Sequence, residues 1–321
     1  MKYGIEYGLV LVASARLRLL PRRARLSCGR ALGSLVFFLD RRHQAITFEN
    51  VQAAFGDQKT DPEKRAIARG AFRHFAAMLI ELITLGRPSW AELERTIEVE
   101  GVERFEKARA RGKGVILVAA HFGNWELHAI AHGYLLGRIF LVARSQDNRY
   151  LNDWLERVRG ISGNEVVYKH RALRQMVKLM KTGETVAFVS DQNVHLDDAV
   201  FVDFFGRKAA TTRVPSWFAL KTGAALVPVF CYPLSNGGYR AIYEEPLDSA
   251  RFAGLEHEAA LMAMTQELAS IQERYVRERP DIWLWMHRRW RTRPPEEAKA
   301  SSSGEAKNED LGEPAALSEA R

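Results

Sequence analysis

Cysteine is scarce in this chain of 321 residues, because only Cys28 and Cys231 occur and they stand far apart. The sequence therefore predicts no disulfide framework and favours a reducing compartment such as the cytoplasm. Long hydrophobic runs are missing too. The two apolar stretches, 7–20 and 31–39, are each shorter than the ~20 residues of a membrane-spanning helix. The first runs into Arg16 and Arg18 rather than a small-residue cleavage site, so a secretory signal is not indicated.

Several motifs of well-known chemistry are also absent. The chain has no G-x-S-x-G elbow, no P-loop and no G-x-G-x-x-G segment. These absences argue against a covalent serine mechanism, ATP-driven chemistry and a dinucleotide, and we expect no cofactor. Zinc-finger spacing and RNA-recognition signatures are missing as well, so nucleic acid is not an expected partner.

Positive charge gathers at the N-terminus of the chain. Residues 1–43 carry a net charge of +7, residues 44–295 carry +5, and residues 296–321 carry −4. A basic segment beside apolar runs favours an anionic membrane surface over nucleic acid. We expect three parts: membrane-associated helices over 1–43, the main domain over 44–295, and a disordered acidic tail over 296–321.

The two apolar stretches predict a helical pair that lies on or dips into the bilayer, with the arginines between them, at 22, 23 and 25, at the headgroups. Two alternatives are open. The pair can pack on the soluble core as amphipathic helices, or the first helix can span the membrane if Arg16 and Arg18 snorkel.

Beyond about residue 97, short apolar runs alternate with helical ones, which predicts an α/β fold with a mostly parallel central sheet flanked by helices. A turn at 233–238 predicts that an antiparallel hairpin ends the sheet. We expect strands at 115–120, 139–143, 165–168, 186–190, 226–231 and 239–243, and helices at 45–55, 61–85, 124–136, 148–159, 171–182, 213–223 and 255–278.

The stretch from His121 to Glu126 follows the first of these strands and precedes a helix. Gly123 permits a tight turn, and Asn124 is a good N-cap, which places Glu126 in the first helical turn. Ligands of open α/β sheets bind at the carboxyl ends of strands, where His121 is expected. This pattern predicts a histidine base with a carboxylate that orients it. The alternative is a capped helix whose histidine merely packs.

Six further landmarks follow this motif in a recognisable order. They are R-S-Q-D-N at 144–148, K-T-G-E with S-D-Q at 181–192, F-F-G at 204–206, A-T-T at 210–212, T-G-A-A-L-V-P at 222–228 and P-D-I-W-L-W-M-H-R-R-W at 280–290. With H-x4-E, they resemble the late lipid A biosynthesis acyltransferases (lauroyl/myristoyl type) of the glycerolipid acyltransferase superfamily, across about residues 1–293. Ala143 and Trp283 depart from that pattern, since tyrosine is common at both positions.

The resemblance implies a glycerol-3-phosphate acyltransferase-like fold at the cytoplasmic face of the inner membrane. It also implies transfer of an acyl chain from acyl carrier protein or coenzyme A to a hydroxyl of a lipid A precursor. His121 would be the general base and Glu126 would orient its imidazole. The expected substrate-binding residues are Asn124, Trp125, Arg144, Asp191, Gln192 and Arg288. The alternatives are a plain surface arginine for Arg144, a structural role for Asp191 and Gln192, and a solvated helix end for Arg288.

Other functions and acceptors remain open at this point. The acceptor can be a phosphatidylinositol mannoside or an ornithine-type or other glycolipid. His128 and His132 stand four apart on one helix, so a zinc metallohydrolase is a rival, and an inactive membrane scaffold is another. Five aromatic residues are candidates for an acyl groove, with plain core as the alternative: Phe201, Phe204, Phe205, Trp217 and Phe218.

Overall fold

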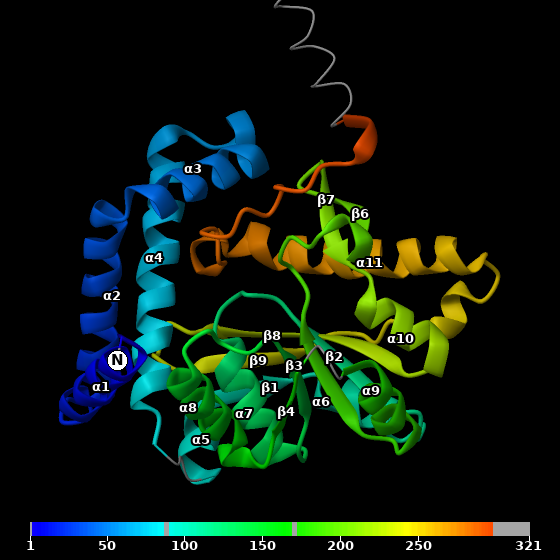
Figure 1. Cartoon of the computed structure of the whole chain (residues 1–321), viewed down its shortest axis with the longest axis horizontal. Coiled ribbons are helices and arrows are strands. Elements are labelled where there is room, and N and C mark those ends of the chain that lie inside the picture. The colour runs from blue at the N-terminus through cyan, green and yellow to red at the C-terminus, as the bar shows by residue number, and fades with distance from the viewer. Residues whose placement is uncertain (1, 87–89, 169–171, 298–321) are drawn as a thin grey trace, which may run out of the picture.

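The computed structural model describes residues 2–86, 90–168 and 172–297. Its centre is a seven-stranded sheet in the order β1-β9-β8-β2-β5-β3-β4 (Figure 1). Every neighbouring pair is parallel except β8 and β9, which form an antiparallel hairpin. The strands are β1 (Ile97–Glu100), β2 (Val115–Ala119), β3 (Phe140–Ala143), β4 (Glu165–Tyr168), β5 (Thr185–Val189), β8 (Ala225–Pro233) and β9 (Tyr239–Tyr243).

Helices cover both faces of this sheet, which explains why β2 is apolar throughout. Val115 and Leu117 face a core shared with α6 and α7, whereas Ile116 and Val118 face a core shared with α9, α10 and α11. These helices and their smaller neighbours are α5 (Trp90–Thr96), α6 (Val102–Arg109), α7 (Trp125–Leu135), α8 (Arg149–Arg159), α9 (Ala172–Lys181), α10 (Val214–Thr222) and α11 (His257–Glu278). Short 3₁₀ turns span Gly56–Gln58, Gly160–Ser162, Leu196–Asp198, Ser249–Phe252 and Pro280–Ile282.

The expected α/β fold with a mostly parallel central sheet flanked by helices is confirmed, and each of the six expected strands corresponds to a strand of the sheet. The expectation that the β8–β9 hairpin ends the sheet was wrong. The short strand β1, which the sequence reading missed, pairs in parallel with β9 and forms the edge. The acidic tail falls outside the described residues from residue 298 onward.

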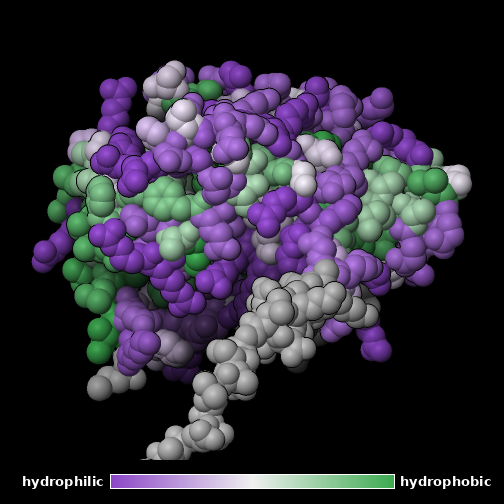
Figure 2. Space-filling view, turned by 90° about the horizontal axis from the view of Figure 1, so that it is seen from above, coloured by the Kyte–Doolittle hydropathy of each residue, from purple (hydrophilic) through white to green (hydrophobic). Residues whose placement is uncertain are grey.

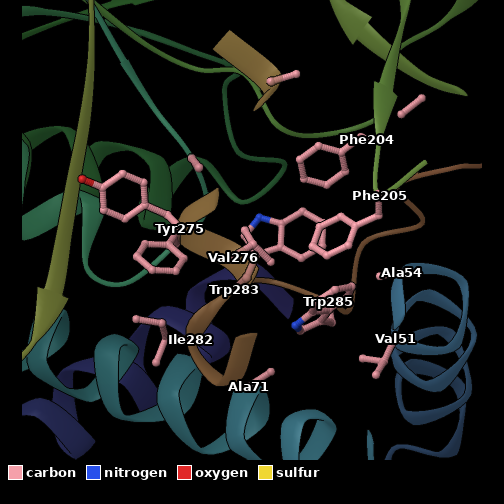
Figure 3. Close-up of a cluster of buried hydrophobic side chains, with 14 of the residues drawn as sticks. Val51, Ala54, Ala71, Phe204, Phe205, Tyr275, Val276, Ile282, Trp283 and Trp285 are labelled. Carbon is pink, nitrogen blue, oxygen red and sulfur yellow. The ribbon is translucent and has the colours of Figure 1, made fainter. Parts of the chain in front are cut away.

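A separate hairpin of β6 (Ala199–Phe204) and β7 (Arg207–Thr212) was also not expected. Its turn places Phe205 and Gly206 at φ values of 55° and 70°, the positive values that tight hairpin turns require. Phe204 and Phe205 pack into a cluster with Trp283 and Trp285 of the C-terminal segment (Figure 3). This cluster joins the hairpin, α11 and the helices α3 and α4.

Four helices precede the sheet: α1 (Lys2–Leu17), α2 (Arg22–Leu39), α3 (Arg41–Phe55) and α4 (Asp61–Thr84). α2 lies against α4 through two glycines. A Cβ on Gly29 would lie 2.6 Å from the Cα of Ala77, and one on Gly33 would lie 2.3 Å from the carbonyl oxygen of Phe72. The arginines expected to link two helices instead form the first turn of α2.

The N-terminal helices keep an apolar outer surface although they pack on α4. Their most exposed apolar side chains are Ile5, Leu9, Val12, Leu19, Leu35, Phe38 and Leu39, each more than half exposed. Figure 2 shows hydrophobic surface along the edge of the molecule where these helices lie. Among the described residues, no helix combines the length and the apolar character needed to cross a membrane.

Candidate functional site

His121 lies just past the carboxyl end of β2, in a tight connection to α7. Gly123 has φ of +60°, and a Cβ there would lie only 1.8 Å from the carbonyl oxygen of Cys231. The tight turn at Gly123 was predicted, and the structure adds that a side chain at this position would clash with the backbone. Asn124 caps α7 by accepting a hydrogen bond from the backbone N–H of Leu127 at 3.0 Å, also as predicted. The connection therefore fixes the backbone on both sides of the histidine.

Asp191 is the carboxylate that holds His121. The Nδ1 of His121 donates to Asp191 Oδ1 at 2.7 Å, and the backbone N–H of His121 donates to Oδ2 at 2.8 Å. The indole Nε1 of Trp283 donates to the same Oδ2 at 2.6 Å. Three donors thus satisfy a carboxylate that is only 2% exposed.

These contacts determine the chemistry of the imidazole. Burial alone would raise the pKa of Asp191, but the proximity and hydrogen bonds of His121, with the bond from Trp283, lower that pKa below its usual value. An ionised carboxylate only accepts hydrogen bonds, so Nδ1 of His121 carries a proton, and in the neutral imidazole Nε2 therefore carries the lone pair. The amide Nε2 of Gln192 lies 3.3 Å from Nε2 of His121.

The expected contact between His121 and Glu126 is not formed in the structure. Glu126 turns toward Arg159 at the end of α8, with Arg159 Nη2 at 2.5 Å from Oε1 and Nε at 2.9 Å from Oε2. Both side chains are largely buried. The physical reason is that α7 starts after His121, so Glu126 in its first turn points to the neighbouring helix. Within the described residues, the hydrogen-bonded carboxylate partner of His121 is Asp191.

His121 and Glu126 nevertheless line one pocket of about 280 Å³. Its mouth is polar, with Arg144, Gln192 and Arg159. Its inner wall lies between α7 and the sheet and is mostly apolar, although it includes the buried side chains of Glu126 and His128. The apolar wall consists of Leu117, Ala119, Ala129, Ile139, Leu141, Ala187, Val189 and Val229. A histidine acceptor therefore stands beside a channel that suits an alkyl chain.

Only some of the remaining predicted binding residues line the pocket. Trp125 lines the pocket and meets the ring of His121 edge-on, with ring centres 4.9 Å apart. Arg144 is exposed at the pocket mouth, where it pairs with Asp147 at 2.8 Å. Asn124 is buried and donates to Glu81 at 3.1 Å, so it supports the wall without lining the pocket. Arg288 is exposed and does not line the pocket either.

The C-terminal segment contributes residues whose role the sequence reading missed. Besides Trp283, His287 accepts a hydrogen bond at Nε2 from the backbone N–H of Asn193, at 2.9 Å. Burial lowers the pKa of His287 to about 4, which keeps it neutral and able to accept. The C-terminal motif at 280–290 was the signal for Trp283 and His287, but it did not indicate which residues they contact. The role of Arg159 was missed as well.

The rival zinc site does not assemble. His128 and His132 lie inside the domain against Phe105 and Tyr243, and burial lowers the pKa of His128 to about 4. No group of three or more His, Cys, Asp or Glu side chains in the described part of the chain is placed to hold a metal ion. None of the five aromatic candidates for the acyl groove lines the pocket, and three of them, Phe204, Phe205 and Phe218, belong to the core, which was the alternative.

The fold and the site are compatible with an acyltransferase. A hydrogen-bonded histidine at the mouth of an apolar pocket can take a hydroxyl proton beside a bound alkyl chain. The chain belongs to the bacterial lipid A biosynthesis acyltransferase family, whose sequence model matches residues 1–292.

Characterised relatives agree with this membership. The chain is 29% identical to the lipid A biosynthesis lauroyltransferase of Escherichia coli K12 over 84% of this chain and 85% of the relative. It is 25% identical to the palmitoleoyltransferase of the same organism over 86% and 87%. A phosphatidylinositol mannoside acyltransferase of Mycolicibacterium smegmatis is more distant, at 22% identity over 70% and 72%. The family resemblance expected from the motifs is therefore confirmed.

Proposed function

We propose that this protein moves a fatty acyl chain from a thioester donor, acyl carrier protein or coenzyme A, to a hydroxyl of a lipid A precursor. The observation that carries the proposal is the lone pair of His121 Nε2, which Asp191 orients at the mouth of an apolar pocket. The relatives named lauroyltransferase and palmitoleoyltransferase support a lipid A acceptor over a phosphatidylinositol mannoside, because their matches cover 84% and 86% of this chain, against 70% and 62% for two phosphatidylinositol mannoside acyltransferases.

In the proposed mechanism His121 is the general base. Nε2 takes the proton of the acceptor hydroxyl as its oxygen attacks the thioester carbonyl carbon. The tetrahedral intermediate collapses with loss of the C–S bond, and the imidazolium returns the proton to the leaving sulfur. Asp191 stabilises the imidazolium that forms between these steps. No acyl-enzyme is needed, which fits the absence of a nucleophile elbow.

Glu126 keeps a part in this proposal, although it does not touch His121. Its carboxylate fixes the guanidinium of Arg159 at the pocket wall with two hydrogen bonds. A fixed cation at the pocket can stabilise the negative charge that develops on the thioester oxygen. We assign Glu126 and Arg159 that electrostatic role, and Arg144 at the rim a contact with the donor or acceptor phosphates.

The acyl chain is assigned to the apolar depth of the pocket. Its walls include Leu117 and Ile139, each 1% exposed, so the channel reaches into the interior of the domain. A chain seated there would place its carbonyl at the mouth, next to His121. The aromatic residues of the core have no part in this assignment.

We also propose that the protein attaches to the cytoplasmic face of the inner membrane through α1 and α2. α1 carries exposed apolar residues and contacts α8, where Asn148 donates to the Tyr3 carbonyl at 3.0 Å. The same Asn148 caps α8 beside the pocket mouth, so the apolar surface adjoins the entrance. Sedimentation with phospholipid vesicles tests this attachment. Protein that stays in the supernatant with neutral and anionic vesicles alike would contradict it.

An acyl-transfer assay tests the proposed reaction. Purified protein is incubated with a tetra-acylated lipid A precursor and one of two donors, acyl carrier protein or coenzyme A, each carrying a radiolabelled acyl chain. We expect a labelled lipid product with one of the donors. His121→Ala should lower kcat by about 10²–10⁴-fold, the usual contribution of a general base.

His257→Ala is the matched control, because His257 is exposed on α11 and does not line the pocket. It should retain the wild-type rate. Undiminished transfer by the His121→Ala protein would remove His121 from the mechanism. A complete lack of product with both donors would overturn the proposed reaction for this acceptor.

A further inference from the structure

A groove lined with arginines lies between the first half of α2 and the turn that joins β8 to β9. It consists of two adjoining cavities of about 240 and 760 Å³, which share Arg22 and Arg30. Six arginines and one aspartate line the two cavities: Arg22, Arg23, Arg30, Arg73, Arg95, Arg279 and Asp281. This arginine groove is therefore a concave, strongly cationic surface, separate from the pocket at His121.

The arginines of the groove differ in whether a carboxylate of the described residues neutralises them. Arg22 pairs with Glu81 at 2.6 Å, and Arg279 pairs with Asp281 at 3.2 Å. Arg30 and Arg73 instead reach hydroxyl groups of α2, those of Ser27 and Ser34, each at 3.2 Å. Among the described residues, neither Arg30 nor Arg73 has an acidic partner within ion-pair distance. Their charge is available to an anion that enters the groove.

The groove approaches the catalytic segment from the other side of α4. His74 lines the groove, and its Nε2 donates to the carbonyl of Gly123, two residues from His121, at 2.9 Å. The next residue, Phe75, stacks on Trp125 of the catalytic pocket, with ring centres 6.3 Å apart. One helix, roughly 10 Å across, thus separates the two sites.

On α2, exposed apolar side chains follow the arginines of the groove. After Arg30, α2 exposes Leu32, Leu35, Phe38 and Leu39 to between 47% and 70%. A molecule that matches this order carries an anionic head beside alkyl chains. Guanidinium groups bind phosphate with two parallel hydrogen bonds, more specifically than they bind a diffuse negative surface. We propose that the arginine groove binds a phosphate group on the headgroup of the acceptor glycolipid, an assignment that rests on the acyltransferase function.

The experiment compares two acceptors with two variants. The acceptors are a phosphorylated lipid A precursor and the same lipid after phosphatase treatment, both in nonionic detergent micelles. The variant is Arg30→Gln with Arg73→Gln. The control is Arg174→Gln with Lys178→Gln, which removes the same charge from exposed positions on α9, away from the groove.

We expect the groove variant to raise KM for the phosphorylated acceptor by at least about tenfold, with kcat changed less than twofold. The dephosphorylated acceptor should show similar KM values with wild type, groove variant and control. A phosphorylated acceptor whose KM does not change in the groove variant would overturn the assignment.

Two other results would overturn it by naming a different anion. A higher KM for the carrier-protein donor alone would identify the groove as a docking site for an acidic protein. Weaker sedimentation with phosphatidylglycerol vesicles, without any change in acceptor KM, would identify it as a contact with bulk anionic lipid. Both donors and both vesicle types are therefore measured with the groove variant and its control.

Direct binding separates this proposal from the proposed reaction. The two lipids are titrated into His121→Ala protein, with and without the groove substitutions. Phosphate-dependent binding that Arg30→Gln and Arg73→Gln abolish would support the groove even if no acyl transfer is found. Acyl transfer whose acceptor KM does not depend on the phosphate would support the proposed reaction and contradict the proposed role of the groove.

Discussion

Asp191→Asn is expected to lower kcat by about 10³–10⁴-fold while changing KM for the donor little. The amide keeps the volume of the carboxyl group and can still accept from Trp283. It no longer offers a negative charge to the imidazolium, and its N–H₂ group can turn His121 into the wrong tautomer. Steady-state kinetics with a saturating lipid acceptor, together with a thermal melt, measure the effect.

The matched control is Asp197→Asn, at an exposed position six residues further along the chain. It should leave kcat unchanged. Glu126→Gln provides the decisive comparison, because Glu126 contacts Arg159 and not His121. If Glu126→Gln stops turnover while Asp191→Asn costs less than about tenfold, Asp191 is not the group that completes the base, and the proposed mechanism is wrong.

The part of the site that depends on local sequence was predictable. The apolar run at 115–119, Gly123 and the capping residue Asn124 lie within ten residues of one another, and they place His121 at the end of a strand without any knowledge of the remaining chain. Strand periods, turn residues and caps are local signals. The same signals predicted the parallel sheet and the boundaries of most helices.

The partner of His121 was not predictable in this way. Asp191 lies 70 residues further along the chain, and it meets His121 because β5 pairs with β2 in register. The sequence indicates that Asp191 follows a strand, but it does not indicate which strand is the neighbour. A nearby carboxylate at Glu126 was therefore chosen over a distant one. Trp283 and Arg159 were missed for the same reason, since their contacts also depend on tertiary packing.

The β6–β7 hairpin shows a second limit. Its turn residues are Phe205 and Gly206, and a phenylalanine with positive φ is not a turn signal that sequence patterns reveal. The backbone N–H of Phe205 donates to Glu273 of α11 at 2.6 Å, and the ring of Phe205 packs on Trp285. Contacts with distant residues thus hold a turn that the local sequence disfavours.

The second large effect is expected from Trp285→Ala. Trp285 is fully buried, its Nε1 donates to the carbonyl of Pro280 at 2.7 Å, and its ring packs against Phe55, Phe205 and Trp283. Replacing a buried tryptophan with alanine costs about 3–5 kcal/mol of folding free energy. For a chain of this size we expect the melting temperature to fall by about 4–8 °C. Calorimetry or circular dichroism measures this change.

Trp217→Ala is the control, because this substitution removes the same atoms and Trp217 is only partly buried on α10. The control should lose clearly less folding free energy than Trp285→Ala. We expect the function to depend on this stability, since Trp283 and His287 flank Trp285 and contact Asp191 and Asn193 near His121. Trp285→Ala should therefore lose activity at temperatures where its circular dichroism is still that of the folded protein. Equal melting of this variant and the wild type would show that the C-terminal segment lies outside the cooperative core, and that Asp191 is held without it.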